Sequence, residues 1–273
     1  MQILITATVA VILLVSVVSS CPSVCNCTSG SNGVYVDCLS RGLDSIPTDL
    51  PNNTYDLQLQ YNMISVIEDN TFNNLPRLYR LHLHHNKITS IKLDTFNNLM
   101  NLYWLELQYN DISVIEDNTF NNLPRLYWLI LQYNDISVIE NNAFSNLPNL
   151  GSLFLNGNKI TSIKSDMFNN LTNLSSLSLS YIDIPVIDDN TFSNLPNLRY
   201  LYLYGNKSTS IKSEMFNNLT NLKFLQIGYN DIAVIEDNTF SNLPNLQYLY
   251  LYGNKITSIK SEMFNNLTNL KFL

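Results

Sequence analysis

The chain has 273 residues, of which 45% are hydrophobic, and its formal net charge is −7. This length is sufficient for a sizeable hydrophobic core. The acidic balance argues against general nucleic-acid binding, which requires a clustered basic surface, and we therefore expect no nucleic-acid partner.

Residues 1–20 are predicted to be a secretory signal peptide. An apolar run extends from Ile3 to Val18, and Val18 and Ser20 place small residues three and one positions before Cys21, as a cleavage site requires. The alternative is a retained membrane anchor, but the run is short for a span and no basic stop follows it. After signal removal we expect no membrane span in this chain, which would be secreted or held at the cell surface.

Residues 21–53 are predicted to form an N-terminal cap. They hold all four cysteines of the chain, at positions Cys21, Cys25, Cys27 and Cys38. Behind a signal peptide this spacing indicates two disulfides, and the spacing alone leaves three pairings open. A zinc knuckle is the alternative, but no histidine lies nearby and a secreted chain disfavours it.

From residue 54 one pattern recurs at a fixed interval. In residues 102–125 it reads L-x-x-L-x-L-x-x-N-x-I-x-x-I-x-x-x-x-F-x-x-L. Nine copies fill residues 54–269, and residues 270–273 begin a tenth. A phenylalanine column runs through every copy, whereas the asparagine column is interrupted once, at Ile182. A fixed period of this kind predicts a stack of equivalent coils around a continuous core.

Each coil is predicted to contribute one short strand, such as Trp104–Gln108, to a parallel sheet. Side chains alternate along a strand, so the two leucines of each L-x-L segment point inward and their neighbours point outward. The asparagine is expected to bond backbone groups of its own and the next turn. The phenylalanine is expected to fill the outer side of the coil.

The cap cysteines, the run LDSIPTDLP and the regular repeat frame together resemble extracellular leucine-rich-repeat proteins. Variable lymphocyte receptors, Toll-like receptors, Slit-type proteins and small matrix proteoglycans share this layout. The resemblance covers residues 21–273. It implies an α/β-type leucine-rich-repeat solenoid, a curved horseshoe with a parallel β-sheet on its concave face and irregular or 3-10 turns on its convex face. It also implies the disulfides Cys21–Cys27 and Cys25–Cys38.

Aromatic side chains are concentrated at the outward strand positions and just beyond them. Tyrosine and tryptophan give large contact areas at low entropic cost and dominate binding hot spots. The alternative is that duplication and strand propensity alone placed the tyrosines. The predicted concave ligand-binding residues are Arg80, His82, His84, Trp104, Glu106, Gln108, Tyr109, Trp128, Ile130, Gln132, Tyr133, Phe154, Tyr200, Tyr202, Tyr204, Phe224, Tyr229, Tyr248, Tyr250 and Tyr252.

The sequence carries no catalytic motif that we can identify, so we predict neither enzymatic activity nor a cofactor. All three histidines stand in one repeat, where His82 and His84 alternate outward and Glu106 lies beside His82 on the next strand. These three side chains could hold a metal ion. We favour a polar, pH-sensitive contact patch instead, and predict no metal site.

Predicted glycosylation sites are Asn52, Asn170, Asn218 and Asn266, each within an N-x-S/T motif. The last three share one repeat position, which follows the phenylalanine and lies away from the strands. Glycans there would shield the back of the solenoid and leave its concave face bare.

The sequence stops at Leu273, where the strand of the tenth repeat begins. We expect a fragment that ends before a C-terminal cap, or a partner or dimer that covers this end. The expected function is recognition of a protein or glycan ligand by the concave face, and the resemblance suggests an immune-type role. The alternative is a matrix, adhesion or guidance protein with a fixed protein partner.

Overall fold

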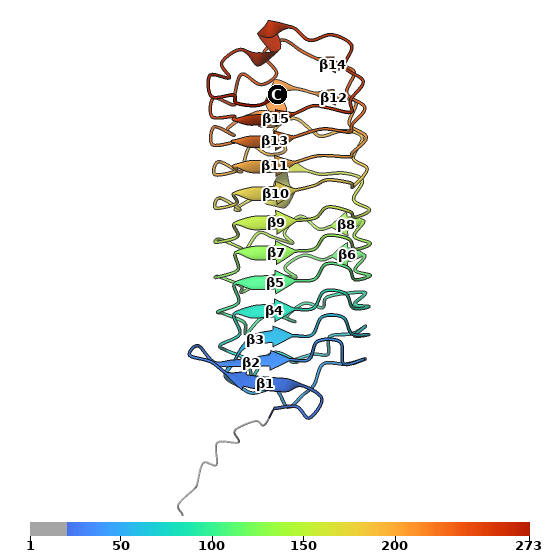
Figure 1. Ribbon diagram of the computed structural model, residues 1–273, viewed down its shortest axis with the longest axis vertical. Coiled ribbons are helices and arrows are strands. Elements are labelled where there is room, and N and C mark those ends of the chain that lie inside the picture. The colour runs from blue at the N-terminus through green and yellow to red at the C-terminus, as the bar shows by residue number, and fades with distance from the viewer. Residues whose placement is uncertain (1–20) are drawn as a thin grey trace, which may run out of the picture.

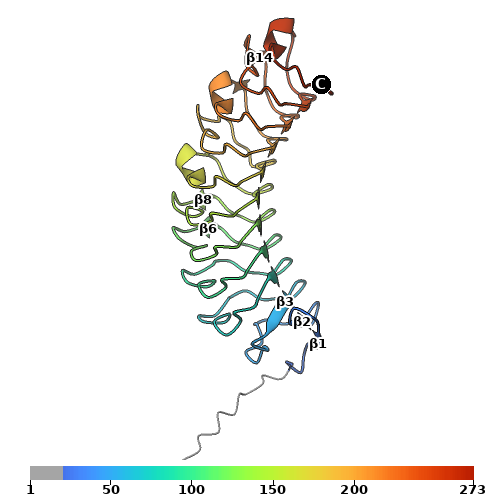
Figure 2. The same ribbon diagram turned by 90° about the vertical axis from the view of Figure 1, so that its left-hand side faces the viewer.

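The computed structural model describes residues 21–273, and the predicted signal peptide lies outside this range. The described chain winds into a stack of coils along one long axis (Figure 1). Figure 2 shows that the stack is curved, with the main sheet on the concave side and the turns and short helices on the convex side. The predicted leucine-rich-repeat horseshoe is therefore confirmed.

One eleven-stranded sheet runs through the molecule in the order β1-β2-β3-β4-β5-β7-β9-β10-β11-β13-β15. Its strands are β1 (Asn26–Ser29), β2 (Val34–Asp37), β3 (Thr54–Gln58), β4 (Arg80–His82), β5 (Trp104–Glu106), β7 (Trp128–Ile130), β9 (Ser152–Phe154), β10 (Ser176–Ser178), β11 (Tyr200–Tyr202), β13 (Phe224–Gln226) and β15 (Tyr248–Tyr250). All neighbours from β2 onward pair in parallel, whereas β1 and β2 are antiparallel.

The other side of the coils carries short elements. Two small parallel sheets and three 3-10 helices are found there: β6 (Val114–Ile115) with β8 (Val138–Ile139), β12 (Ser210–Ile211) with β14 (Val234–Ile235), η1 (Ser165–Phe168), η2 (Ser213–Phe216) and η3 (Ser261–Phe264). The irregular outer turns alternate with these elements, as the resemblance implied.

The repeat strands are shorter than predicted. Strand β5 ends at Glu106, two residues before the predicted end at Gln108. Hydrogen bonding to the next coil nevertheless continues, because the Leu107 N–H donates to the Ile130 carbonyl over 2.9 Å. Tyr109 then adopts a left-handed φ of 56°, which turns the chain out of the sheet.

The constant length of the repeat fixes the register of the main sheet. Leu105 of β5 lies opposite Leu81 of β4 on one side and Leu129 of β7 on the other. All three leucines are fully buried, so each coil stacks its apolar side chains directly on those of the next coil. The outward residues are therefore also in register, and every outward column forms a row across the concave face.

The asparagine column forms a hydrogen-bonded ladder that is interrupted once, at Ile182. In the coil of Asn110, the amide nitrogen donates to the carbonyls of Leu107 and Leu83, both at 3.0 Å. The amide oxygen accepts the N–H of Ile88, also at 3.0 Å. We predicted that the asparagine bonds its own coil and the following coil, but it bonds its own coil and the preceding one. The reason is that the chain turns inward beside the coil that precedes it.

The phenylalanine column forms a buried spine along the outer side of the core. Eight of its members are at most 1% exposed: Phe72, Phe96, Phe120, Phe144, Phe168, Phe192, Phe216 and Phe240. The Phe120 ring lies 6.1 Å from that of Phe96 and 6.0 Å from that of Phe144, centroid to centroid. Burial of each ring contributes about 1.5–3 kcal/mol.

The N-terminal end of the sheet is closed by the cap. Disulfides join Cys21 to Cys27 and Cys25 to Cys38, which confirms the pairing that the resemblance implied. The hairpin of β1 and β2 lies beside β3, and Val36 of β2 pairs with Leu57 of the first repeat. The cap therefore covers the apolar layer that the first coil would otherwise expose.

Candidate functional site

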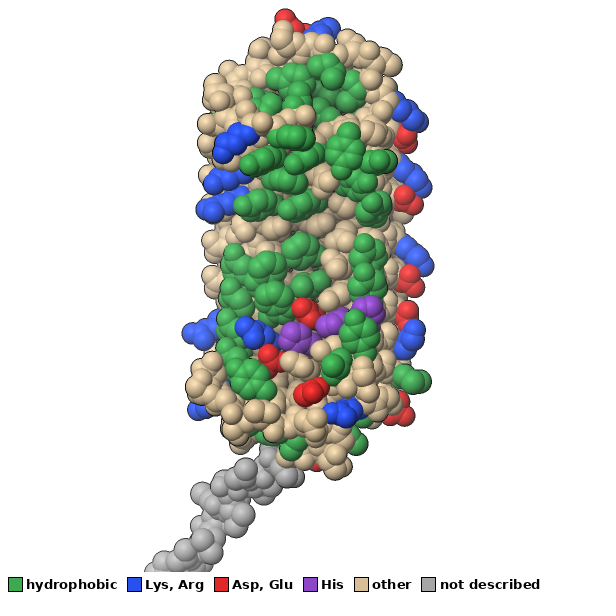
Figure 3. All heavy atoms as spheres, viewed as in Figure 1, with side chains coloured by type: hydrophobic (Ala, Val, Ile, Leu, Met, Phe, Trp, Pro, Cys, Tyr) green, Lys and Arg blue, Asp and Glu red, His purple; other side chains and the backbone are tan. Residues whose placement is uncertain are grey.

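The predicted binding residues lie on the concave face, and they divide into three groups (Figure 3). A group of polar side chains occupies β4, β5 and the residues that follow. Apolar side chains cover the face farther along the solenoid, in two areas separated by a band of small polar residues. The face thus offers charge at one end and aromatic surface over the rest.

The first aromatic area, the tryptophan platform, consists of Trp104, Trp128 and Phe154. The two indole rings stack with centroids 4.8 Å apart, and the Phe154 ring lies 6.0 Å from Trp128 at an interplanar angle of 5°. All three side chains are half-buried. Trp104 and Trp128 pair directly in the sheet, whereas Phe154 pairs with Ile130 and reaches the Trp128 ring diagonally.

The second aromatic area, the tyrosine cluster, covers β11, β13 and β15 and the turns after them. Its residues are Tyr200, Tyr202, Tyr204, Phe224, Tyr229, Tyr248, Tyr250 and Tyr252. Phe224 lies at its centre, 5.1 Å from the ring of Tyr202 and 5.2 Å from that of Tyr250. A hydrogen bond with Tyr181 is the main cause that raises the pKa of Tyr204 to about 12.

A depression separates the two aromatic areas. Ser178 of β10 pairs with Phe154 on one side and Tyr202 on the other, so a small side chain stands between two aromatic ones. Ser178 and Ser180 are both buried. The resulting cavity of about 300 Å³ is lined by Phe154, Asn156, Ser178, Ser180, Tyr181, Tyr202, Tyr204 and Gln226. The concave face is therefore shaped to receive a protruding group between two aromatic walls.

The turns that end the strands form an aromatic row along one edge of the face, which we call the edge ladder. Tyr61, His85, Tyr109 and Tyr133 stack at centroid distances of 4.4, 4.3 and 4.7 Å, and each has a left-handed φ between 52° and 59°. Sequence analysis placed the tyrosines just beyond the strands but did not include His85. Partial burial and the neighbouring His84 lower the pKa of His85, so it stacks as a neutral ring.

Farther along, glycines alternate with tyrosines in this row. Gly157 follows Tyr133 by one coil, and a Cβ atom at Gly157 would lie 2.5 Å from the Tyr133 ring. The same relation joins Tyr181 to Gly205, with φ 69° at the glycine. Each of these tyrosines therefore lies flat over a glycine of the next coil.

The polar cluster brings together the histidines and acids of the first coils. His82 Nδ1 lies 2.7 Å and His84 Nδ1 2.9 Å from the same oxygen of Glu106, Oε2. The other oxygen, Oε1, accepts the indole N–H of Trp104 over 2.7 Å. The predicted adjacency of the three titratable side chains is thus present, and Trp104 joins the cluster to the tryptophan platform.

Asp56 was not predicted and forms the floor of the polar cluster. It is 3% exposed, and its carboxylate lies 3.5 Å from His82 Nε2 and 3.6 Å from the Arg80 guanidinium. Extending the outward columns back to the first repeat would have found it, because Asp56 pairs directly with Arg80 in the sheet.

The cluster shifts the pKa of two members in opposite directions. Burial alone would lower the pKa of His82, but its contacts with Asp56 and Glu106 outweigh this and raise the pKa to about 9. Burial would likewise raise the pKa of Glu106, but its close contacts with His82 and His84 hold it well below its ordinary value. At neutral pH the protonated His82 ring therefore lies between the side chains of Asp56 and Glu106.

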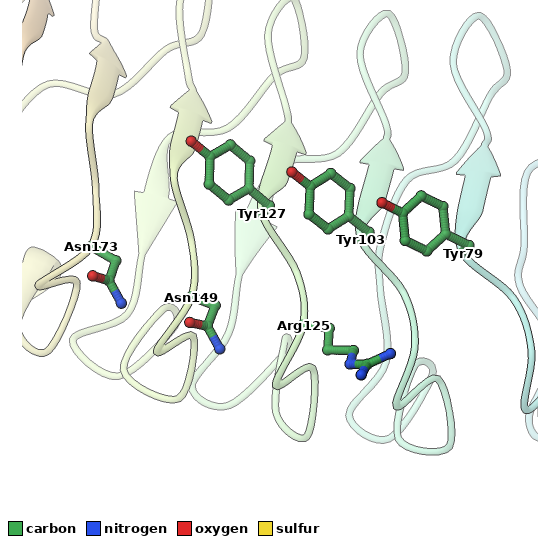
Figure 4. A pocket seen from close by; sticks show the side chains of 6 residues that line it. All are labelled: Tyr79, Tyr103, Arg125, Tyr127, Asn149 and Asn173. Atoms are coloured by element: carbon green, nitrogen blue, oxygen red, sulfur yellow. The ribbon is translucent and has the colours of Figure 1, made fainter.

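A second aromatic row, absent from the sequence-based prediction, lies on the flank where the chain enters the strands. Tyr55, Tyr79, Tyr103 and Tyr127 stack at 5.0, 5.0 and 5.3 Å. Figure 4 shows the last three beside a groove of about 500 Å³ that is also lined by Arg125, Asn149 and Asn173. Burial raises the pKa of Tyr103. The regular spacing of these tyrosines in the sequence is a signal that could have revealed the row. Tyr79, Tyr103 and Tyr127 each precede a strand, however, so the alternation of side chains along the strands does not include them.

The predicted glycosylation positions lie on exposed turns. Asn170, Asn218 and Asn266 have left-handed φ values of 67°, 65° and 68° and follow η1, η2 and η3. Asn52 is exposed in the cap. Asn206 also begins an N-x-S motif, but its amide nitrogen donates to the Leu179 carbonyl over 2.8 Å within the buried ladder.

No helix among residues 21–273 has the length and apolar character needed to cross a membrane.

Two family models match the chain. One, described as BspA type Leucine rich repeat region (6 copies), matches residues 65–199. The other, described as Leucine rich repeat, matches residues 173–232, 205–256 and 220–273. Together they extend from residue 65 to residue 273, and neither describes an enzyme.

Curated relatives match only short stretches. Leucine-rich repeat-containing protein 3 of Rattus norvegicus is 45% identical over 60 residues, which make up 22% of this chain and 23% of that protein. Leucine-rich repeat-containing G-protein coupled receptor 6 of Danio rerio is 47% identical over 58 residues, 21% of this chain and 6% of that protein. The chain covers less than a quarter of the length of each relative.

Solved structures match most of the chain. The TLR13–ssRNA13 complex aligns with a TM-score of 0.67 and 28% identity over 83% of this chain and 37% of that one. A leucine-rich-repeat protein of Leptospira interrogans aligns with a TM-score of 0.66 and 26% identity over 85% and 63%. The Drosophila Toll–Spätzle complex, at 23% identity over 79% and 30% and a TM-score of 0.74, shows the fold alone.

The disulfides and the receptor-like relatives are consistent with an extracellular or cell-surface location, and the structural neighbours with a ligand-binding recognition module. The repeat frame, the cap and both family models agree. The chain therefore belongs to the leucine-rich-repeat proteins.

Proposed function

We propose that this chain is an extracellular recognition module that binds a protein or glycan ligand on its concave face. The observation that carries the proposal is the tryptophan platform, which exposes part of a stack of Trp104, Trp128 and Phe154 to solvent. No side chain of the described coils covers this face (Figure 3). Aromatic rings that no core requires are typical of contact surfaces.

The shape of the face supports binding of a sizeable partner. The depression at Ser178 and Ser180 lies between the tryptophan platform and the tyrosine cluster, so a ligand that inserts one group there contacts both aromatic areas. The polar cluster adds fixed charges at one end, which favour one orientation of the ligand over others. This division into anchors and orienting charges is common in specific interfaces.

An immune-type role is the finer part of the proposal. It is supported by the likeness to the structure of TLR13, which was solved with a single-stranded RNA. The net charge of −7 favours a protein or glycan ligand over a nucleic acid for this chain. Binding is expected to be non-covalent and without catalysis.

The tryptophan platform can be tested by substitution. We expect Trp104→Ala and Trp128→Ala each to weaken ligand binding by about tenfold or more, since central aromatic anchors contribute about 2 kcal/mol or more. The wild-type chain is first screened on arrays of extracellular proteins and glycans, and the dissociation constants of any ligand found are then compared. Val234→Ala, an exposed change on the opposite side of the coils, is the control. Equal affinity of all three variants and wild type would rule out the concave platform as the binding site.

The proposed glycans would leave this face free. We expect chains expressed in a secretory pathway to carry N-linked glycans at Asn170, Asn218 and Asn266, because these residues lie on exposed turns of the convex side. Intact mass before and after glycosidase treatment measures the modification, and Asn218→Gln should remove one glycan. An unchanged mass on glycosidase treatment would contradict the proposal.

A further inference from the structure

We propose that His82, His84 and Glu106 form a binding site for a divalent metal ion of the zinc class. Their ligand atoms all lie within 4.8 Å of one another. Sequence analysis favoured a contact patch at these residues. The structure adds two features that sequence analysis did not use: the positions of the ligand atoms, and the side chains that hold them.

The distances are close to those of a metal site. Nδ1 of His82 and Nδ1 of His84 lie 2.7 and 2.9 Å from Glu106 Oε2. Tetrahedral zinc with bonds of about 2.0–2.1 Å separates its ligand atoms by about 3.3 Å. Widening these two separations by about half an ångström, within the range of side-chain rotation, would bring them to the zinc value, while the two histidine nitrogens already lie within 4.8 Å of each other.

Asp56 is placed as the outer partner of one ligand. Metal-bound histidines usually donate their second ring N–H to a carboxylate, which fixes the tautomer and the ring orientation. Asp56 Oδ1 lies 3.5 Å from His82 Nε2 and is a buried oxygen without a hydrogen bond among the described residues. A metal on His82 Nδ1 would fix the proton on Nε2, facing this oxygen.

Trp104 and the sheet position the other ligands. The indole N–H of Trp104 holds Glu106 Oε1, which leaves Oε2 directed at the two histidines. His84 Nδ1 is buried and makes no well-aligned hydrogen bond, although it lies close to Glu106. A metal ion bound to this nitrogen would supply the partner that it lacks among the described residues.

The donor set indicates which ions would bind. Two imidazole nitrogens and one carboxylate oxygen suit zinc, copper or nickel rather than calcium or magnesium, which prefer all-oxygen sites. The side chains of His82, His84 and Glu106 retain 17%, 17% and 14% exposure on the concave face. Three protein ligands with an open side leave a fourth position for water.

Calorimetric titration of the chelator-treated chain with zinc chloride tests the site. Mildly alkaline buffer is used, because metal ligands bind in their deprotonated forms. We expect one zinc ion per chain in the wild type and at least tenfold weaker binding in His84→Ala and Glu106→Gln. Asp56→Asn removes no ligand and should weaken binding by about tenfold or more. Calcium chloride should give no binding at this site.

The third histidine of the same coil provides the matched control. His85→Ala changes a ring that stacks between Tyr61 and Tyr109, so it should bind zinc as the wild type does. Circular dichroism and thermal melting establish that each variant is folded. If a ligand variant fails to fold, the visible spectrum of cobalt bound to the wild type reports the nitrogen and oxygen ligands directly.

The proposal is overturned if the wild type binds no zinc stoichiometrically, or if His85→Ala weakens binding as much as His84→Ala. A cobalt spectrum of a six-coordinate, water-rich ion would also overturn it. Ligand binding by the tryptophan platform is measured separately with chelator present, so either proposal can fail without the other.

Discussion

Replacing Phe120 with alanine is expected to lower the free energy of unfolding by about 3–5 kcal/mol. The ring is 1% exposed and lies between those of Phe96 and Phe144 in the phenylalanine spine. The spacing of coils is fixed by the backbone hydrogen bonds of the sheet, so neighbouring rings cannot move together to fill the space. The cost should therefore lie near the upper part of the range for a buried phenylalanine.

Urea unfolding, followed by circular dichroism, measures this change. Val114→Ala in the same coil is the control, because Val114 is 36% exposed, and its substitution should cost less than about 1 kcal/mol. Coils contact only their neighbours, so the loss of hydrogen-exchange protection should be largest in the coils next to Phe120. A loss below about 1 kcal/mol in Phe120→Ala would contradict the account of the spine.

Asn110→Ile and Ile182→Asn exchange the same two residue types at equivalent positions of two coils, and we expect them to change the free energy of unfolding differently. Asn110→Ile is expected to destabilise the fold by about 2–4 kcal/mol. The Ile88 N–H would lose its acceptor. The carbonyls of Leu83 and Leu107 would each keep one donor, from Asn86 and Asn134 respectively.

The chain already contains this defect farther along the ladder. Ile182 stands where the asparagine should be, and it is fully buried. The Ile160 N–H, which corresponds to that of Ile88, therefore lacks the side-chain acceptor. Ile182→Asn would supply one, and could also donate to the Leu155 and Leu179 carbonyls, each of which now accepts one ladder amide.

We expect Ile182→Asn to leave stability unchanged or to raise it by about 1 kcal/mol, since new hydrogen bonds offset the lost apolar burial. Amide hydrogen exchange provides the sharper test. The Ile160 amide should exchange faster than that of Ile136, which donates to Asn158 over 3.0 Å, and Ile182→Asn should slow it. Destabilisation of both Asn110→Ile and Ile182→Asn by similar amounts would contradict the ladder account.

Residues 174–221 contain two departures from the repeat, Ile182 and Ser208, and on sequence grounds we predict this stretch to be the least stable part of the solenoid. The second departure, Ser208, replaces an inward isoleucine, and the structure indicates that it destabilises the coil less than expected. The Ser208 hydroxyl donates to the Ile184 carbonyl over 3.2 Å, and its N–H donates to the Asn230 amide. The departure at Ile182 leaves the Ile160 N–H without its side-chain acceptor, and in the same coil the Asn206 amide oxygen accepts from the Ile182 N–H instead of the Ile184 N–H.

The fold followed from the sequence because periodicity specifies it. A repeat of constant length fixes both the burial of Leu105 and the adjacency of His82 and Glu106, since equal spacing places equivalent residues side by side. The disulfide pairing did not follow from spacing, which left three choices; it came from the resemblance alone. Strand length was overestimated because local turn geometry, not hydrophobic pattern, ends the strand before Tyr109.

The parts of the site that sequence analysis missed lie where strand alternation does not apply. Tyr127 precedes its strand and His85 follows one in a left-handed turn, so neither can be assigned a direction from the alternation of side chains. Asp56 is the exception, because it follows the alternation and extension of the outward columns to the first repeat would have found it. Contact between Trp104 and Glu106 depends on rotamers, which no sequence pattern records.

The tyrosines that lie over glycines have a consequence for how this molecule can change in length. Tyr133 with Gly157, Tyr181 with Gly205 and Tyr229 with Gly253 join coils in twos. The same coils are joined by ion pairs between acids and lysines two residues farther on: Asp135 with Lys159, Asp183 with Lys207, and Asp231 with Lys255. Deletion of one of these coils would leave a glycine without its tyrosine or bring two tyrosines into adjacent coils, as in the edge ladder, whereas deletion of two would restore every match. From Tyr133 to Gly253 the matching unit is thus a pair of coils, and we expect length changes in this part to be tolerated best in multiples of two coils.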